Sequence, residues 1–163
     1  LSEQAAAPPG VQAVPLLTLD EVAVLPAGHA LAAQAVLQVQ DFANQPFVSL
    51  SADDPYRRQI DARFAEAGVA RQLHLQTHSA VAVCAMVQQG LGLAIVNPLT
   101  ALAMAGSGLV VRRLGFSVPF SINALLPLYR PALPEAQPLV QSLEAQAQEV
   151  TAALQRLLSQ PAN

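Results

Sequence analysis

The chain has no tryptophan and no lysine, a single cysteine, and few aromatic residues for its length of 163. Aromatic residues make up 4% of the sequence against 53% for all hydrophobic residues, so the core must consist largely of Ala, Val and Leu. Pro, Gly or Asn interrupts the longest apolar runs, and none reaches the ~18 residues that a membrane span requires. The composition therefore predicts a soluble globular protein, with no membrane contact, that forms one ordinary domain or two small lobes.

With Cys84 as the only cysteine, an internal disulfide and a cysteine metal cluster are both excluded. Because Cys84 lies in an apolar segment, we expect a small buried hydrophobe instead of a reactive thiol. The histidines at 29, 74 and 78 lack the spacing and the carboxylate neighbours of a metal site. We therefore expect neither a metal nor another cofactor. A reducing, cytoplasmic setting fits this cysteine usage best.

Positive charge is also scarce, since eight arginines stand against eleven acidic residues and the net charge is −3. A surface that binds duplex DNA usually carries a basic stripe and a high isoelectric point, and this sequence has neither. The chain by itself is therefore not expected to bind DNA. Its N-terminus has no initiator Met and no basic segment before an apolar one. We expect it to be excised from a longer reading frame and not to carry an intact secretory signal.

Short apolar segments alternate with longer amphipathic ones, which indicates an α/β architecture. The expected strands cover 21–25, 47–50, 73–75, 93–96, 109–111 and 122–126. The expected helices begin at Asp54-Pro55, at Ser79 and at Asn97-Pro98, and a last helix covers about 135–158. The run at 93–96 has no polar alternation, which is typical of a strand covered on both faces of a parallel sheet.

Three of the strand-to-helix junctions share one design, in which a polar cap follows a strand. They run from Leu50 to Asp54-Pro55, from Gln76 to Ser79 and from Val96 to Asn97-Pro98. In a parallel sheet these junctions open on one edge, where ligands of open α/β sheets bind. Free backbone N–H groups at the helix starts favour a carboxylate or another anion. The predicted ligand-binding residues are Ser51, Tyr56, Arg57, Thr77, His78, Ser79 and Asn97. Each polar residue at a helix start also fits a simple cap, contributing about 1 kcal/mol, so only their convergence favours a site.

Spacing separates the two adjacent arginines of the first helix. Asp54 and Arg58 are four residues apart in the favourable order for a helix-surface pair, which assigns Arg58 to the surface. Arg57 and Asp61 have the weaker order. Arg57 is therefore our candidate partner for a ligand carboxylate, through its bidentate fork, and a solvated surface role is an equal alternative.

No catalytic constellation is recognisable in the sequence. His78 and Ser79 are adjacent, and neighbours in sequence seldom form a nucleophile–base pair; a Gly-x-Ser-x-Gly elbow is also missing. Gly90-Leu-Gly92 lies between a helix and a strand, the reverse of the order in a dinucleotide-binding fingerprint. We therefore predict no catalytic residues and a protein that is not an enzyme.

Three segments in the same order resemble the effector domain of LysR-type bacterial transcriptional regulators. The segment 25–32, Leu-Pro-Ala-Gly-His-Ala-Leu-Ala, is similar to the family's Pro-x-Gly-His-Pro-Leu-Ala turn, with Ala30 in place of proline. Asp41-Phe42 and the Pro-Phe-Val at 46–48 resemble its Asp-Leu and Pro-Phe-Ile pair. The segment 87–95 is similar to its Val-x-x-Gly-Leu-Gly-Ile motif. The segments 53–59 and 94–100 also resemble the branch that senses opines and basic amino acids.

The resemblance implies a two-lobed fold of the periplasmic-binding-protein type II class, with an effector in the cleft between the lobes. On this basis residues 1–25 end the first-lobe segment, 26–108 form a complete second lobe, and 109–163 return to a partial first lobe with the C-terminal helix. The chain would sense a small anionic or zwitterionic metabolite, such as an amino acid or opine-like compound. The whole protein would be a dimer or tetramer that binds DNA through an absent helix-turn-helix domain.

A partial first lobe would leave the apolar stripe of the last helix incompletely covered, so we expect the chain to self-associate. The alternative function is an extracytoplasmic solute-binding protein of the same fold, which would need a signal or lipoprotein segment upstream.

Overall fold

The computed structural model describes residues 1–3, 7–106, 108–129 and 134–159. Its strands are β1 (Val11–Asp20), β2 (Val22–Pro26), β3 (Val36–Leu37), β4 (Pro46–Leu50), β5 (Gln72–Thr77), β6 (Ala94–Val96), β7 (Leu109–Leu114) and β8 (Pro119–Pro127). Its helices are α1 (Pro55–Glu66), α2 (Ala80–Gln88), α3 (Pro98–Met104) and α4 (Ala136–Leu158), with short 3-10 turns at Ala30–Ala33 and Val39–Phe42. The expected alternation of strands and helices is confirmed.

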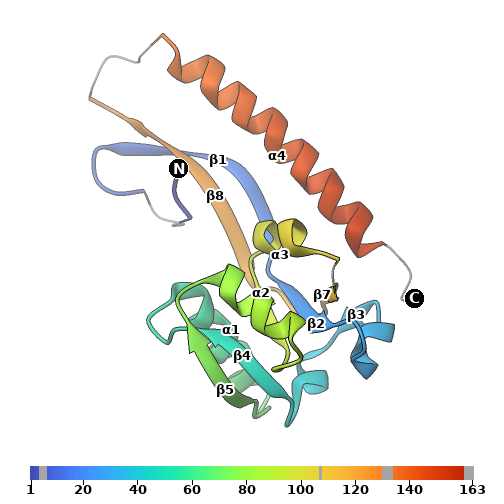
Figure 1. Cartoon of the computed structure of the whole chain (residues 1–163). Coiled ribbons are helices and arrows are strands. Elements are labelled where there is room, and N and C mark those ends of the chain that lie inside the picture. Colours follow the sequence, from blue (N-terminus) through green and yellow to red (C-terminus); the bar gives the residue numbers. More distant parts are fainter. Residues whose placement is uncertain (4–6, 107, 130–133, 160–163) are drawn as a thin grey trace.

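The chain forms two parts of unequal size (Figure 1). The smaller part is the long antiparallel pair β1–β8 with α4 beside it. The larger part is a sheet in which β3, β7, β2 and β6 are neighbours, flanked by the pair β4–β5. A parallel bridge between Phe47 and Leu93 joins β4 to β6, so the sheet continues as β5-β4-β6-β2-β7-β3.

The core of the larger part lies on both faces of this sheet. On one face, α2 packs Val83, Cys84 and Val87 against β2 and β6. On the other, Phe42, Phe47 and Phe64 meet edge to face, with ring centroids 5.6–6.1 Å apart. All three residues of β6 are buried, which confirms a strand covered on both sides. Cys84 is buried as expected, and burial raises the pKa of its thiol to about 11.

The helix starts predicted from the sequence coincide with the starts of helices in the structure. Asp54 caps α1 by accepting hydrogen bonds from two backbone N–H groups, and Pro55 occupies the first helical position. Tyr56, Ile60 and Phe64 form its buried face. The strand expected at 21–25 is β2, and a separate longer strand, β1, precedes it and ends at Asp20.

The crossings between the two parts differ from the predicted boundaries at 25/26 and 108/109. β2 and β7 pair with each other inside the larger sheet, so both strands belong to the larger part. The crossings therefore lie at Asp20–Glu21 and in the segment 115–118. An apolar strand such as β2 looks the same in sequence whichever sheet it joins, so the sequence alone does not place these crossings. Hydrogen bonds tie the two crossings together, from Glu21 N to Val118 O at 2.9 Å and from the Ser117 hydroxyl to Asp20 at 2.6 Å.

Candidate functional site

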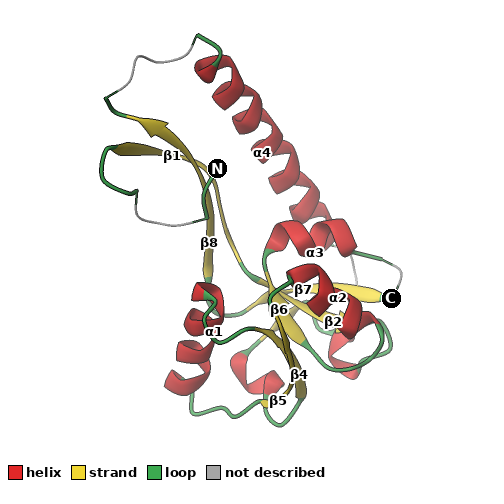
Figure 2. Cartoon of the chain, turned by 60° about the vertical axis from the view of Figure 1, so that its left-hand side comes forward, coloured by secondary structure: helices red, strands yellow, loops and turns green. Residues whose placement is uncertain are grey.

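The three predicted junctions open on one edge of the larger sheet. β4 is parallel to β5, and its bridge to β6 is also parallel, so Leu50, Thr77 and Val96 end their strands at the same side. This edge faces the smaller part. The Tyr56 ring, just after the first junction, lies 5.4 Å from the Phe120 ring of β8, measured between centroids. Figure 2 shows the corresponding proximity of α1 to the lower end of β8.

Capping is a real role of the polar residues at these helix starts. The Asp54 carboxylate accepts from Tyr56 N and Arg57 N at 2.8 and 3.0 Å. The Ser79 hydroxyl accepts from Ala82 N at 3.3 Å, and Asn97 accepts from Thr100 N at 2.8 Å. Each cap uses one side-chain oxygen, and the Thr77 hydroxyl accepts from Ser79 N at 3.4 Å. Ser51, Thr77 and Asn97 are half-buried, whereas His78 and Ser79 are exposed.

Arg57 is buried at the first junction instead of projecting into solvent. Its Nε donates to both carboxylate oxygens of Asp61, at 2.8 and 2.9 Å, and its Nη1 donates to Leu50 O at 2.8 Å. These bonds fasten the end of β4 to α1. Burial lowers the pKa of Arg57 from its ordinary value. Arg58 is exposed, as its assignment to the surface predicted, although the Asp54 carboxylate caps the helix and is not the surface partner expected for Arg58.

Tyr56 links the two parts of the chain. Its hydroxyl donates to the backbone carbonyl of Glu3 at 3.1 Å, across 53 positions of sequence. The side chain is 8% exposed, and burial, the largest contribution, raises the pKa of its phenol. Tyr56 therefore lies at the predicted edge, at the interface between the two parts. Neither its spacing nor its neighbours in sequence indicate the contact with Glu3.

Sequence reasoning missed Glu21, which stands at the same edge. β2 runs antiparallel to β6, and Val22 pairs with Val96, so the residue before Val22 lies beside the residue after Val96. Glu21 is 2% exposed, and its Oε2 has no hydrogen-bond partner within the described residues. Burial, then the carboxylates of Asp54, Glu3 and Asp20, raise the pKa of Glu21 to about 8. The available signal was an acid placed directly before a fully apolar strand.

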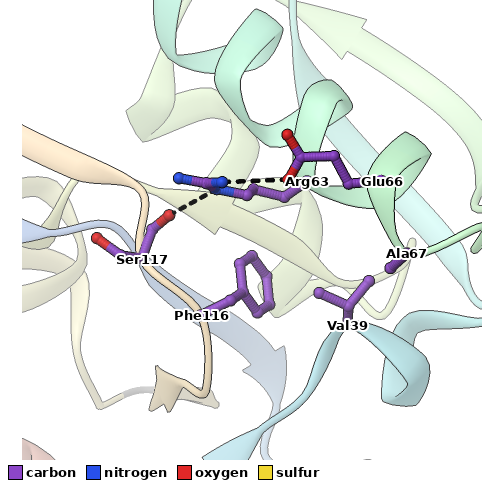
Figure 3. Close-up of a pocket in the computed structure, with 6 residues that line it drawn as sticks. All are labelled: Val39, Arg63, Glu66, Ala67, Phe116 and Ser117. Atoms are coloured by element: carbon purple, nitrogen blue, oxygen red, sulfur yellow. Dashed lines mark hydrogen bonds and ion pairs between the residues drawn. The ribbon is translucent and has the colours of Figure 1, made fainter.

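Two hollows lie outside this edge. One, of about 470 Å³, opens between the last turns of α1 and the second crossing, where Arg63 donates to Ser117 O at 3.0 Å (Figure 3). The other, of about 300 Å³, lies between β1 and α4. No predicted site residue lines either hollow, and the Arg63 side chain is 43% exposed. Neither offers the buried polar groups that orient a small ligand.

The chain belongs to the LysR substrate binding domain family, whose model matches residues 1–148. It is 45% identical to the transcriptional activator protein LysR of Escherichia coli K12, over 98% of this chain and 51% of that protein. It is 28% identical to the regulatory protein NocR of Agrobacterium tumefaciens T37, over 76% of this chain and 41% of that protein. The chain thus spans about half the length of the curated relatives it matches.

Solved structures show the same fold. The regulatory domain of Synechocystis CcmR in complex with 2-PG has a TM-score of 0.74 at 15% identity, covering 90% of this chain and 71% of that chain. The resemblance drawn from three motifs is therefore confirmed, as is the two-lobed fold of periplasmic-binding-protein type II class. These relatives are named as regulators, so the solute-binding alternative is not favoured. Among the described residues, no helix is both long and apolar enough to cross a membrane.

Proposed function

We propose that this chain is the effector-sensing part of a LysR-type transcriptional regulator, and that a small zwitterionic or anionic metabolite binds between its two parts. The observation that carries this proposal is the convergence of three strand-to-helix junctions on the one edge that faces β1–β8. Ligand binding there would bias an equilibrium between lobe arrangements. In the complete protein, a dimer or tetramer in the cytoplasm, that bias would alter DNA binding by a helix-turn-helix domain.

The polar groups of the edge favour a carboxylate near the start of α2. The start of α1 is already occupied by the Asp54 carboxylate, which would repel a second anion. The α2 start carries only Thr77, His78 and Ser79, with the positive end of the helix dipole behind them. Ser51, Tyr56 and Asn97 complete the proposed lining. We assign Arg57 a positioning role, because Asp61 and Leu50 O engage its guanidinium.

Binding rather than catalysis suits this arrangement, because its polar groups serve as caps and hydrogen-bond donors and none forms a nucleophile–base pair. The relatives are regulators, and we extend that role to this chain. The whole activity of the protein would then be the closure of its two parts on the ligand and the resulting change in DNA binding.

A thermal-shift panel of amino acids and opines, run on the protein expressed from its complete reading frame, tests the proposal. A ligand at about 100 times its Kd should stabilise the fold by about 2.7 kcal/mol. His78→Ala should weaken the response without lowering the melting temperature of the empty protein, because His78 is exposed at the edge. His74→Ala is the matched control, an exposed histidine within β5. Equal responses of the two variants would contradict the proposed site.

A further inference from the structure

We propose that Arg63, Ser117 and Asp20 form a brace that limits how far the two parts of the chain move against each other. The brace starts on the last turns of α1 and lies outside the proposed ligand-binding edge. Its existence is independent of the proposed function, whereas its consequence for sensing rests on that function. The observation that carries it is a chain of hydrogen bonds at the second crossing.

The boundary between the two parts is sharply placed at both crossings. Val118 is fully buried in the core of the larger part, whereas Pro119, the next residue, already pairs with Asp20 at the end of the β1–β8 pair. Glu21 N donates to Val118 O at 2.9 Å, directly beside that pair. A rotation of one part against the other therefore changes backbone dihedral angles between Asp20 and Glu21 and between Val118 and Pro119.

Ser117 joins the two sides of this boundary. Its backbone carbonyl accepts from Arg63 Nε at 3.0 Å, and its hydroxyl donates to the Asp20 carboxylate at 2.6 Å. Glu66 holds the Arg63 guanidinium on α1, with its carboxylate 3.1 Å from Arg63 Nη1 (Figure 3). Ser117 lies on the larger-part side of the boundary and Asp20 ends the smaller part. The bond between them must therefore stretch or break when the parts rotate.

Helix α1 meets the smaller part near one end and the boundary near the other. Tyr56 in its first turn bonds Glu3 O and packs on Phe120. Arg63 follows seven residues later, two helical turns on, so it lies on the same face roughly 10 Å further along the helix. A rigid helix that is fastened at two separated points resists rotation of the parts more than a single contact would.

The apolar contacts near the boundary have no fixed direction. The last turn of α4 reaches the core of the larger part through Leu157 and Leu158. The Phe116 ring meets Phe64 edge-on, with centroids 6.2 Å apart, and also lines the hollow of about 470 Å³. Such contacts allow some sliding, whereas hydrogen bonds weaken steeply when their angles change. We therefore assign the restraint on rotation to the brace.

The consequence for sensing is a change in effector affinity without any contact to the effector. The brace stabilises the present arrangement of the two parts, so its removal raises the population of other arrangements. A ligand that binds one arrangement has an apparent affinity scaled by the fraction of molecules in that arrangement. The three brace residues would thus set how much effector the protein needs.

Hydrogen exchange followed by mass spectrometry tests the brace on the protein expressed from its complete reading frame, with no compound added. The reporter is the Glu21 amide, which bonds Val118 O at the boundary. Ser117→Ala removes the hydroxyl that bonds Asp20 and should speed exchange of this amide about fivefold. Ser142→Ala, an exposed serine of α4, is the matched control and should leave it unchanged. Peptides from the buried strand β6 should exchange at wild-type rates in both variants.

Further variants separate the brace from a local effect of Ser117. Arg63→Ala removes the bond to Ser117 O and should speed exchange of the Glu21 amide, whereas Arg58→Ala, also exposed on α1, should not. Asp20→Ala and Ser117→Ala break one bond, so the double variant should exchange no faster than the faster single variant. Additive effects, or wild-type exchange in Ser117→Ala or Arg63→Ala, would overturn the brace. Because no effector is used, that result would leave the proposed function standing.

Discussion

At the residue scale, Tyr56 and Glu21 both lie at the boundary between the two parts but differ in their hydrogen bonding. The Tyr56 hydroxyl has a partner in Glu3 O, and its ring packs on Phe120, so it holds the two parts in their present arrangement. Glu21, at the same edge, keeps one oxygen without a partner within the described residues.

Tyr56→Phe tests the first of these roles. The variant keeps the ring against Phe120 and removes only the hydroxyl, so it should lower the free energy of unfolding by about 1 kcal/mol in urea titration. Tyr129→Phe removes a hydroxyl from a side chain that is 87% exposed and should change little. Equal losses for the two variants would show that the bond to Glu3 O contributes nothing.

At the scale of elements, the position of the site depends on how β4 joins β6. The join is short, with hydrogen bonds from Val48 N to Leu93 O and from Leu93 N to Pro46 O, both 2.8 Å. Gly92 makes it possible, because its φ is +149° and a Cβ there would lie 2.6 Å from Pro46 O. The Gly-Leu-Gly motif therefore serves close strand approach, and through it the alignment of two strand ends on one edge.

Substituting the two glycines of that motif separates crowding from backbone strain. Gly90→Ala has open space and a φ of +77°, so it should cost about 1–2 kcal/mol for the left-handed conformation alone. Gly92→Ala meets the backbone of Pro46 as well and should cost about 3 kcal/mol or more. Thermal unfolding of both variants measures the difference. If Gly90→Ala proved the more harmful change, close approach of β4 would not be the reason for Gly92.

At the scale of the whole molecule, the smaller part leaves several large apolar side chains exposed to solvent. α4 runs beside the β1–β8 pair (Figure 1), and only Leu154 of its apolar stripe is buried, while Leu139 is 60% exposed. Leu128 and Tyr129, near the end of β8, are also exposed. An apolar surface of this kind favours association with a second copy.

Size-exclusion chromatography with light scattering tests that expectation on the 163-residue chain. We expect species larger than a monomer and binding of a hydrophobic dye, both reduced by Leu139→Gln. Val81→Gln is the control, since Val81 is also exposed, at 55%, but lies on α2 of the larger part. A monomer that binds no dye would contradict the prediction.

Local patterns proved sufficient for most of the elements. Asp54-Pro55, Ser79 and Asn97-Pro98 mark helix starts because a cap acts on N–H groups two or three residues away. The motifs at 25–32, 41–48 and 87–95 were enough to indicate the family. The burial and the hydrogen-bond partners of the charged residues depend on long-range contacts. Arg57, for example, bonds both Asp61 and the backbone carbonyl of Leu50, and the second of these contacts has no signal in the spacing of charged residues.

The sequence by itself determined the α/β class, the strand-to-helix junctions and the membership of the family, because periodicity, caps and motifs act over a few residues. Only the tertiary structure decided where the chain crosses between its parts and that Glu21 joins the junctions at their edge. That placement depends on the antiparallel register of β2 with β6, a pairing between segments some 70 residues apart. Burial and the absence of a partner for a carboxylate are properties of the assembled fold, because they depend on every segment that packs around it.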